Sequence, residues 1–225
     1  MQSHGNTMFA IGHFALGYLT GKGSSKAAKT KPNLQLLLVA SVLPDVDLVL
    51  QVVNDRLFMH RGPTHSIITV TVLMIPFFFL YRKQAIPYFV ALLSHPLVGD
   101  LPTGGIEMLW PATRHWFGSS VIQIGSLADV VTEFALFAVT TSLMFKAGDL
   151  KELWKPKSGN LLLIIAFAAV LGPMLEISQG SDAALPLLLI PASAFWLVLF
   201  AYSIIRHLRG SGARKATLIH AETQK

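Results

Sequence analysis

The chain has 225 residues and a formal net charge of +6, with 52% hydrophobic but only 13% charged residues. Soluble domains carry roughly 25% charged residues, so this composition excludes an ordinary soluble protein and indicates an all-α, polytopic membrane protein. The absence of cysteine excludes disulfides, thiolate nucleophiles and thiolate metal sites. Any metal must therefore bind to His, Asp or Glu.

Seven apolar runs predict about six to seven membrane helices in a single membrane domain. They cover residues 8–21, 33–53, 66–81, 84–99, 126–145, 161–177 and 183–205. The first run would reach only about 21 Å at 1.5 Å per residue, against a hydrocarbon core of roughly 30 Å, so it is short enough to be re-entrant. No Lys or Arg precedes its apolar part, so we expect no cleaved secretory signal.

Lys and Arg residues gather between the apolar runs. The clusters lie at residues 22–31, 82–83, 146–157 and 206–215. An even number of crossings separates each cluster from the next, so all four fit on one side, which the positive-inside rule makes cytoplasmic. The loop around His60, residues 100–125 and the turn at 179–182 then share the opposite face. The positive charge thus reflects topology, and we expect no nucleic-acid partner.

Residues 60–66 read His-Arg-Gly-Pro-Thr-His-Ser. Pro63 keeps the segment between the two histidines from being a regular helix interior. Both rings can therefore turn towards one point, and neutral imidazole is the commonest protein ligand of transition metals. The alternative is a polar loop that starts a membrane helix, with Thr64 or Ser66 as its cap.

Asp45 and Asp47 interrupt an otherwise uncharged apolar run. A carboxylate at membrane depth costs about 2.5–3.5 kcal/mol, which favours a shared partner over two carboxylates that reach for water at a helix end. Residues two apart in an α-helix point about 200° away from each other. Both carboxylates can face one site only if the helix breaks, and we expect the break after Pro44.

His95 and Asp100 form a further pair. On a regular helix, residues five apart would point about 140° away from each other. We expect the helix to end near Gly99 and Pro102, so that Asp100 can turn back towards His95. Residues 100–125, rich in Gly, Pro and Trp, predict an interfacial or partly re-entrant loop whose Trp residues anchor it in the membrane interface.

Four motifs follow one another along the chain. They are Gly12-His13, Leu-Pro-Asp-x-Asp at 43–47, His-Arg-Gly-x-Thr-His-Ser at 60–66, and Leu-Ser-His with a following Asp, Gly and Leu-Trp-Pro within 93–111. In this order they resemble the YdjM-type family of inner-membrane proteins, described as membrane-bound metal-dependent hydrolases. The resemblance covers residues 12 to about 130, and residues 140–225 match only as apolar helices.

The resemblance implies a metal site with Arg61 and Thr64 beside it. The implied ligands are His13, Asp45, Asp47, His60, His65, His95 and Asp100. On the residues alone, His13 would be read as a packed, hydrogen-bonded core histidine. The family commonly places the Asp four residues after the His, whereas Asp100 follows His95 by five.

A sulfur-free His/Asp site suits zinc first, with manganese or magnesium as alternatives, and seven candidate ligands suffice for two ions. Paired metals that activate water recur in phosphoester hydrolysis, so we expect a metal-dependent hydrolase. We assign catalytic roles to Asp47, Arg61 and Thr64, with Arg61 as a bidentate donor to phosphate. A site at the outer ends of membrane helices meets lipid headgroups, so the expected partner and substrate is a phospholipid or other lipid-linked phosphoester.

Two other classes remain open. A metal or proton transporter would need polar residues that continue towards the cytoplasmic face, and residues 66–81 and 183–205 offer few. A non-catalytic regulator would use the metal only to stabilise its fold and would bind a protein partner through its basic tail. In this organisation residues 1–145 form the metal-site half, 146–205 add apolar helices, and 206–225 are the basic soluble tail.

Overall fold

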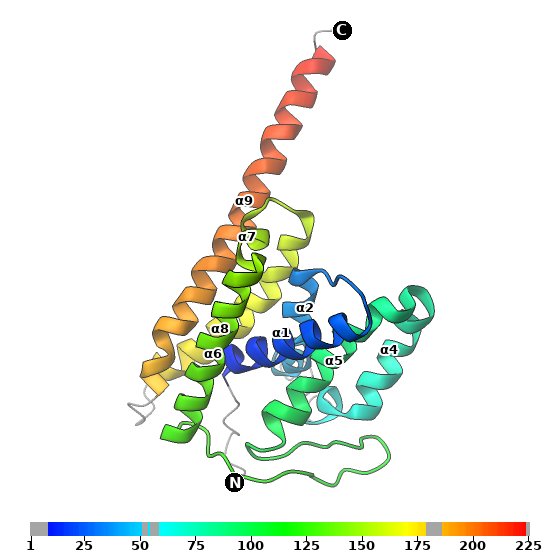
Figure 1. The fold of residues 1–225 in the computed structure, drawn as a ribbon, viewed down its shortest axis with the longest axis vertical. Helices are drawn as coiled ribbons and strands as arrows, with labels where there is room; N and C mark the ends of the chain where they lie inside the picture. Colours follow the sequence, from blue (N-terminus) through cyan, green and yellow to red (C-terminus); the bar gives the residue numbers. More distant parts are fainter. Residues whose placement is uncertain (1–8, 51–53, 55–58, 179–185, 224–225) are drawn as a thin grey trace.

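Figure 1 shows the computed structural model of the chain, which describes residues 9–50, 54, 59–178 and 186–223. Secondary structure in these residues is helical apart from two isolated bridges, Thr103 with Ser120 and Ile106 with Phe117. Three helical segments among them are long and apolar enough to cross a membrane: Ile67–Asp100, Leu127–Ala147 and Leu187–Ser211. The predicted all-α membrane architecture is therefore confirmed.

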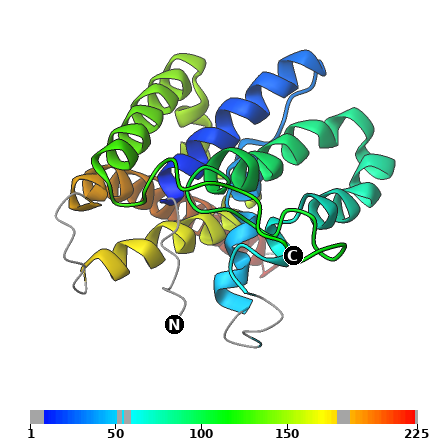
Figure 2. The same ribbon diagram turned by 90° about the horizontal axis from the view of Figure 1, so that it is seen from below.

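The first helix, α1 (Ala10–Ala27), lies in the middle of the fold (Figures 1 and 2). Its first half is buried, with Phe14 at 0% exposure, because α1 packs against α5 (Ile86–Ser94) and α6 (Leu127–Ala147). The helix extends beyond the predicted end at Gly21 and includes 18 residues, or about 27 Å.

The second predicted run, residues 33–53, does not form one helix. Asn33 caps α2 (Leu34–Ala40) by accepting a backbone N–H, and a 3-10 turn (Leu43–Val46) and α3 (Asp47–Leu50) follow. The expected break after Pro44 was placed too late, since α2 already ends at Ala40. A proline ring clashes with the carbonyl four residues before it, and for Pro44 that carbonyl belongs to Ala40. Residues 51–53 lie outside the described part.

The segment Ile67–Asp100 folds back on itself at Arg82, whose φ of 51° ends α4 (Ile67–Tyr81). A 3-10 turn (Arg82–Ala85) leads into α5, which returns antiparallel to α4 (Figure 1). These two helices correspond to the predicted runs at 66–81 and 84–99.

The last helices form a second layer beside α1. Helix α6 begins after Ser126, whose Oγ accepts a first-turn N–H, and it ends at Gly148 in the left-handed conformation. The following helices are α7 (Asp149–Trp154), α8 (Leu163–Ser178) and α9 (Ile190–Thr223). Trp196 and Phe200 of α9 pack against Phe14 of α1, and α9 then extends well beyond the bundle (Figure 1).

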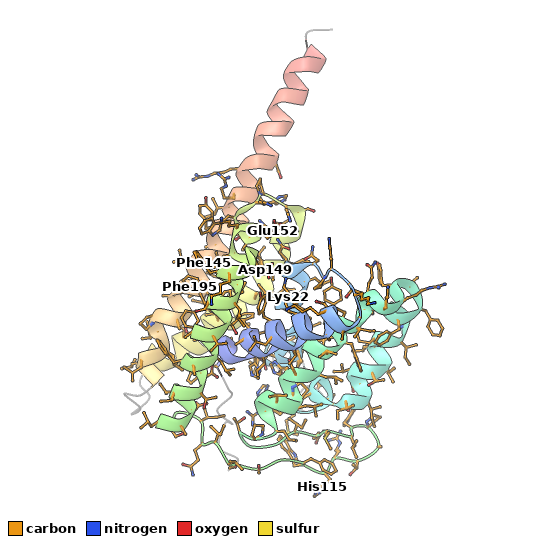
Figure 3. The ribbon with its side chains drawn as sticks, viewed as in Figure 1. Lys22, His115, Phe145, Asp149, Glu152 and Phe195 are labelled. Carbon is orange, nitrogen blue, oxygen red and sulfur yellow. The ribbon has the colours of Figure 1, made fainter. Side chains whose placement is uncertain are left out.

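Two of the segments that carry basic clusters meet on one side of the bundle. Lys22 Nζ of α1 lies 2.6 Å from Asp149 Oδ2 of α7. In Figure 3, Lys22, Asp149 and Glu152 lie away from His115, which marks the opposite end of the fold. This arrangement agrees with the predicted shared side of the first and third clusters. The predicted turn at 179–182 is outside the described residues.

Candidate metal centre

The His60 loop is shaped by a short 3-10 turn, Pro63–His65, that leads into α4. Ser66 caps α4 by accepting the N–H groups of Ile68 and Thr69 through its Oγ, so this part of the alternative interpretation is correct. Thr64 does not cap the helix. Its Oγ donates instead to Asp47 Oδ2 at 2.7 Å.

Asp47 holds both histidines of this loop. Its Oδ1 lies 2.9 Å from His60 Nδ1, and its Oδ2 lies 3.2 Å from His65 Nδ1. The same Oδ2 accepts a hydrogen bond from the backbone N–H of Arg61 at 3.2 Å. Arg61 has a φ of 62°, which turns the chain towards Asp47. Since an ionised carboxylate can only accept, each Nδ1 carries a proton, and in the neutral ring the lone pair is then on Nε2.

Asp47 is fully buried but outside the three membrane-crossing segments. Burial opposes its ionisation, but hydrogen bonds from His60 and His65 outweigh that effect and lower the pKa of its carboxyl to about 2. The carboxylate therefore stays charged at neutral pH and orients both rings. The prediction named Asp47 as a ligand and catalytic residue, whereas the structure places it behind the histidines.

A π-helix brings His95 and Asp100 together. The six residues His95–Asp100 continue α5 with wider turns, in which residues five apart lie above one another. His95 Nε2 consequently lies 3.3 Å from Asp100 Oδ2. The helix does end near Gly99 and Pro102, at Asp100, as expected. Asp100 reaches His95 because the wider turn absorbs the extra residue between the two side chains, and not because the chain turns back after the helix.

His95 is oriented from α2 by a backbone carbonyl. Its Nδ1 donates to the carbonyl oxygen of Ser41 at 2.8 Å, so in the neutral ring its Nε2 also presents a lone pair. Metal-binding histidines almost always donate their other ring N–H to a carboxylate or carbonyl. His60, His65 and His95 all have this arrangement.

The remaining donor atoms converge on His65 and His95. The two Nε2 atoms lie 3.2 Å apart. Asp45 Oδ1 lies 3.1 Å from His95 Nε2 and 3.6 Å from His65 Nε2. Asp100 Oδ2 is 3.3 Å from both. The ring of His13 stacks on His95 with centroids 3.6 Å apart. Three overlapping groups could each hold an ion, namely His13/Asp45/His95, Asp45/His60/His65 and His65/His95/Asp100.

The chemistry of this donor set fits a cation. Asp45 Oδ1, Asp100 Oδ2 and His60 Nε2 are buried and lack a hydrogen-bond partner among the described residues. Buried polar atoms without a partner are costly. A divalent ion in any one of the three groups would give the atoms of that group a partner. Six of the seven predicted ligands belong to the three groups, and Asp47 does not.

Arg61 is a buried part of the site, with 5% of its surface exposed. Its Nη2 donates to Asp100 Oδ1 and to Thr103 Oγ, both at 2.9 Å, while its Nε has no partner in the described part. Thr103 was not predicted, although it belongs to the Leu-Pro-Thr-Gly-Gly stretch after Asp100. The guanidinium thus fixes one candidate ligand and keeps one free donor.

The loop at residues 101–125 covers this end of the bundle (Figure 2). Glu107 N–H donates to the Arg61 carbonyl at 2.9 Å, and Ser66 Oγ donates to the Trp110 carbonyl at 2.6 Å. Ile106 of this loop is fully buried. The predicted interfacial loop is therefore fastened directly to the segment that carries His60 and His65.

The family model described as YdjM inner membrane protein matches residues 8–206. The chain belongs to this family. The match includes the apolar helices after residue 140, which carry none of the four motifs. No curated protein and no solved structure matches the chain. As a YdjM inner membrane protein, the chain combines a membrane location with buried His/Asp groups that could hold a metal ion.

Proposed function

We propose that this YdjM protein is a membrane-bound, metal-dependent hydrolase that cleaves a phosphoester of a lipid. One observation carries the proposal: the Nε2 atoms of His65 and His95 lie 3.2 Å apart between the carboxylates of Asp45 and Asp100. Such a cluster of imidazole nitrogens and carboxylate oxygens suits a divalent ion. Zinc is favoured because every donor is an imidazole nitrogen or a carboxylate oxygen, with manganese or magnesium as alternatives.

The ligand roles follow from which atoms are left free. We assign metal binding to His13, Asp45, His60, His65, His95 and Asp100. Asp47 orients His60 and His65 through their Nδ1 atoms, and Thr64 in turn binds Asp47. Three overlapping donor groups leave room for a second ion.

A bound divalent ion would lower the pKa of water to about 7 and polarise a phosphoryl oxygen. The protein supplies the rest of the chemistry. Arg61 holds Asp100 through Nη2, and its unpartnered Nε is the donor that remains for a phosphate oxygen. The side chains of Asp45 and His60 are each 13% exposed, so they lie closest to an approaching substrate.

The position of the centre supports a lipid substrate. Its donors His65 and Asp100 lie at the two ends of the folded-back segment Ile67–Asp100, beside the covering loop, and this favours a position near one membrane surface. Trp116 in that loop is 43% exposed, as expected for an aromatic side chain in the headgroup region. We propose that this is the extracytoplasmic surface, because the basic clusters lie on the other side.

The test is a screen of phospholipids and lipid-linked phosphates in detergent micelles. The metal content of the purified protein is measured by elemental analysis, and released phosphate or headgroup is the readout. We expect turnover that a chelator abolishes and that rises with pH as water becomes more acidic on the metal. His65→Ala should lose metal and turnover together, whereas Arg61→Lys should keep the metal and turn over more slowly.

His207→Ala is the matched control, since its ring pairs with Ser211 on α9 and it should keep both metal and turnover. Metal-loaded protein that hydrolyses no phosphoester would contradict the proposal. The metal would then be a structural, non-catalytic site in a membrane regulator.

A further inference from the structure

His13 is held differently from the other histidines of the centre. Both of its ring nitrogens lack a hydrogen-bond partner among the described residues. Its contacts there are the stack on His95, with an interplanar angle of 12°, and a distance of 4.0 Å from its Nε2 to Asp100 Oδ1. With no hydrogen bond to orient the ring, its place depends on where the first turn of α1 lies.

That first turn has no cap of its own. Phe9 is the N-cap residue of α1, and its side chain cannot accept a hydrogen bond. Glu133 of α6 supplies the missing acceptor, because its Oε1 accepts the Phe9 N–H at 3.0 Å. The backbone N–H of Gly12, the residue before His13, also interacts with this carboxylate. The first N–H groups of a helix need such partners, and a carboxylate is favoured there.

Glu133 is also an unusual residue for its position. It is 0% exposed within α6, a segment that can cross the membrane, and its Oε2 has no hydrogen-bond partner in the described part. Carboxylates in such segments are costly and usually have a function. Glu133 belongs to none of the three metal groups, so its function is not ligation.

We infer that Glu133 is the positioning residue for His13, holding the first turn of α1 so that the imidazole reaches the metal centre. The inference depends on the proposed function only in requiring that the centre binds metal. A residue of α6, which carries none of the ligand motifs, thus controls the position of one ligand of the site.

The experiment compares zinc affinity of the purified full chain, measured by chelator competition, in four α6 variants. Glu133→Gln keeps an acceptor oxygen and should bind zinc nearly as well as the wild type. Glu133→Leu removes the acceptor and should bind about 10-fold more weakly, the scale typical of outer positioning groups. Glu133→Asp shortens the side chain by one methylene, so its zinc affinity should lie between those of the Gln and Leu variants. Asp129→Asn is the matched control, since Asp129 lies on the same helix but accepts the N–H of Gly125, which precedes that helix.

A second background separates positioning from general stability. With His13→Ala already present, Glu133→Leu should cause no further loss of zinc affinity, because the ligand that it positions is gone. A further tenfold loss in that background, or unchanged zinc affinity in the single Glu133→Leu variant, would overturn the inference. If Glu133→Leu does not fold, the zinc affinity of Glu133→Asp is compared in the wild-type and His13→Ala backgrounds instead. Wild-type protein without zinc affinity would refute the metal centre itself, and with it this inference.

Discussion

Gly17→Ala should disturb the metal centre from a position that touches none of its donors. Gly17 lies where α1 crosses α2 at close range, and a Cβ added there would be 2.1 Å from the Cβ of Ser41. Ordinary contacts begin at 3.4 Å, so the two helices would have to separate by about 1.3 Å. Overpacking of this kind costs about 1–3 kcal/mol of folding free energy.

The consequence for metal binding follows from the Ser41 carbonyl. That oxygen accepts the Nδ1 proton of His95 at 2.8 Å, and a shift of about 1 Å would break this hydrogen bond. Losing such an outer hydrogen bond typically lowers metal affinity about 10- to 100-fold. We therefore expect Gly17→Ala to bind zinc 10- to 100-fold more weakly while it remains folded.

The assay is zinc competition with a chelator, with thermal unfolding in detergent measured in parallel. Gly23→Ala is the control on the same helix, because a Cβ there meets no atom within 4 Å. It should leave zinc affinity unchanged and stabilise the helix by up to about 1 kcal/mol. Ser41→Gly added to Gly17→Ala removes the clashing Cβ and should restore part of the affinity. If Gly17→Ala binds zinc as tightly as Gly23→Ala, the link from α2 to His95 is refuted.

Two further predictions concern stability and topology. Asn160→Ala should lower the free energy of unfolding by about 1–3 kcal/mol, because the buried amide accepts from one side chain and donates to two carbonyls; an unchanged thermal midpoint would contradict this. In the natural cysteine-free background, a cysteine replacing His115 should react with a membrane-impermeant thiol reagent from outside the cell, and one replacing Glu152 should not. The reverse labelling pattern would place the centre on the cytoplasmic side.

The sequence by itself determined the class of the protein and most of its candidate ligands. Low charge and long apolar runs require a helical membrane protein whatever the packing, because unpaired backbone groups are too costly in lipid. His60, His65, His95 and Asp100 could be named because ionisable side chains stand out in an apolar chain. The end of α2 could have been predicted too, since Pro44 excludes the carbonyl of Ala40 from a continuing helix.

Only the tertiary structure decided what each of these groups does. Asp47 and Asp45 look alike in the sequence, yet Asp47 is enclosed by N–H and O–H donors of the His60 loop while Asp45 faces the free lone pairs. The π-helix that aligns Asp100 with His95 has no marker in hydropathy. A backbone carbonyl such as that of Ser41 carries no side-chain signal at all. These roles depend on contacts between segments tens of residues apart, whereas periodicity and composition report only on neighbours along the chain.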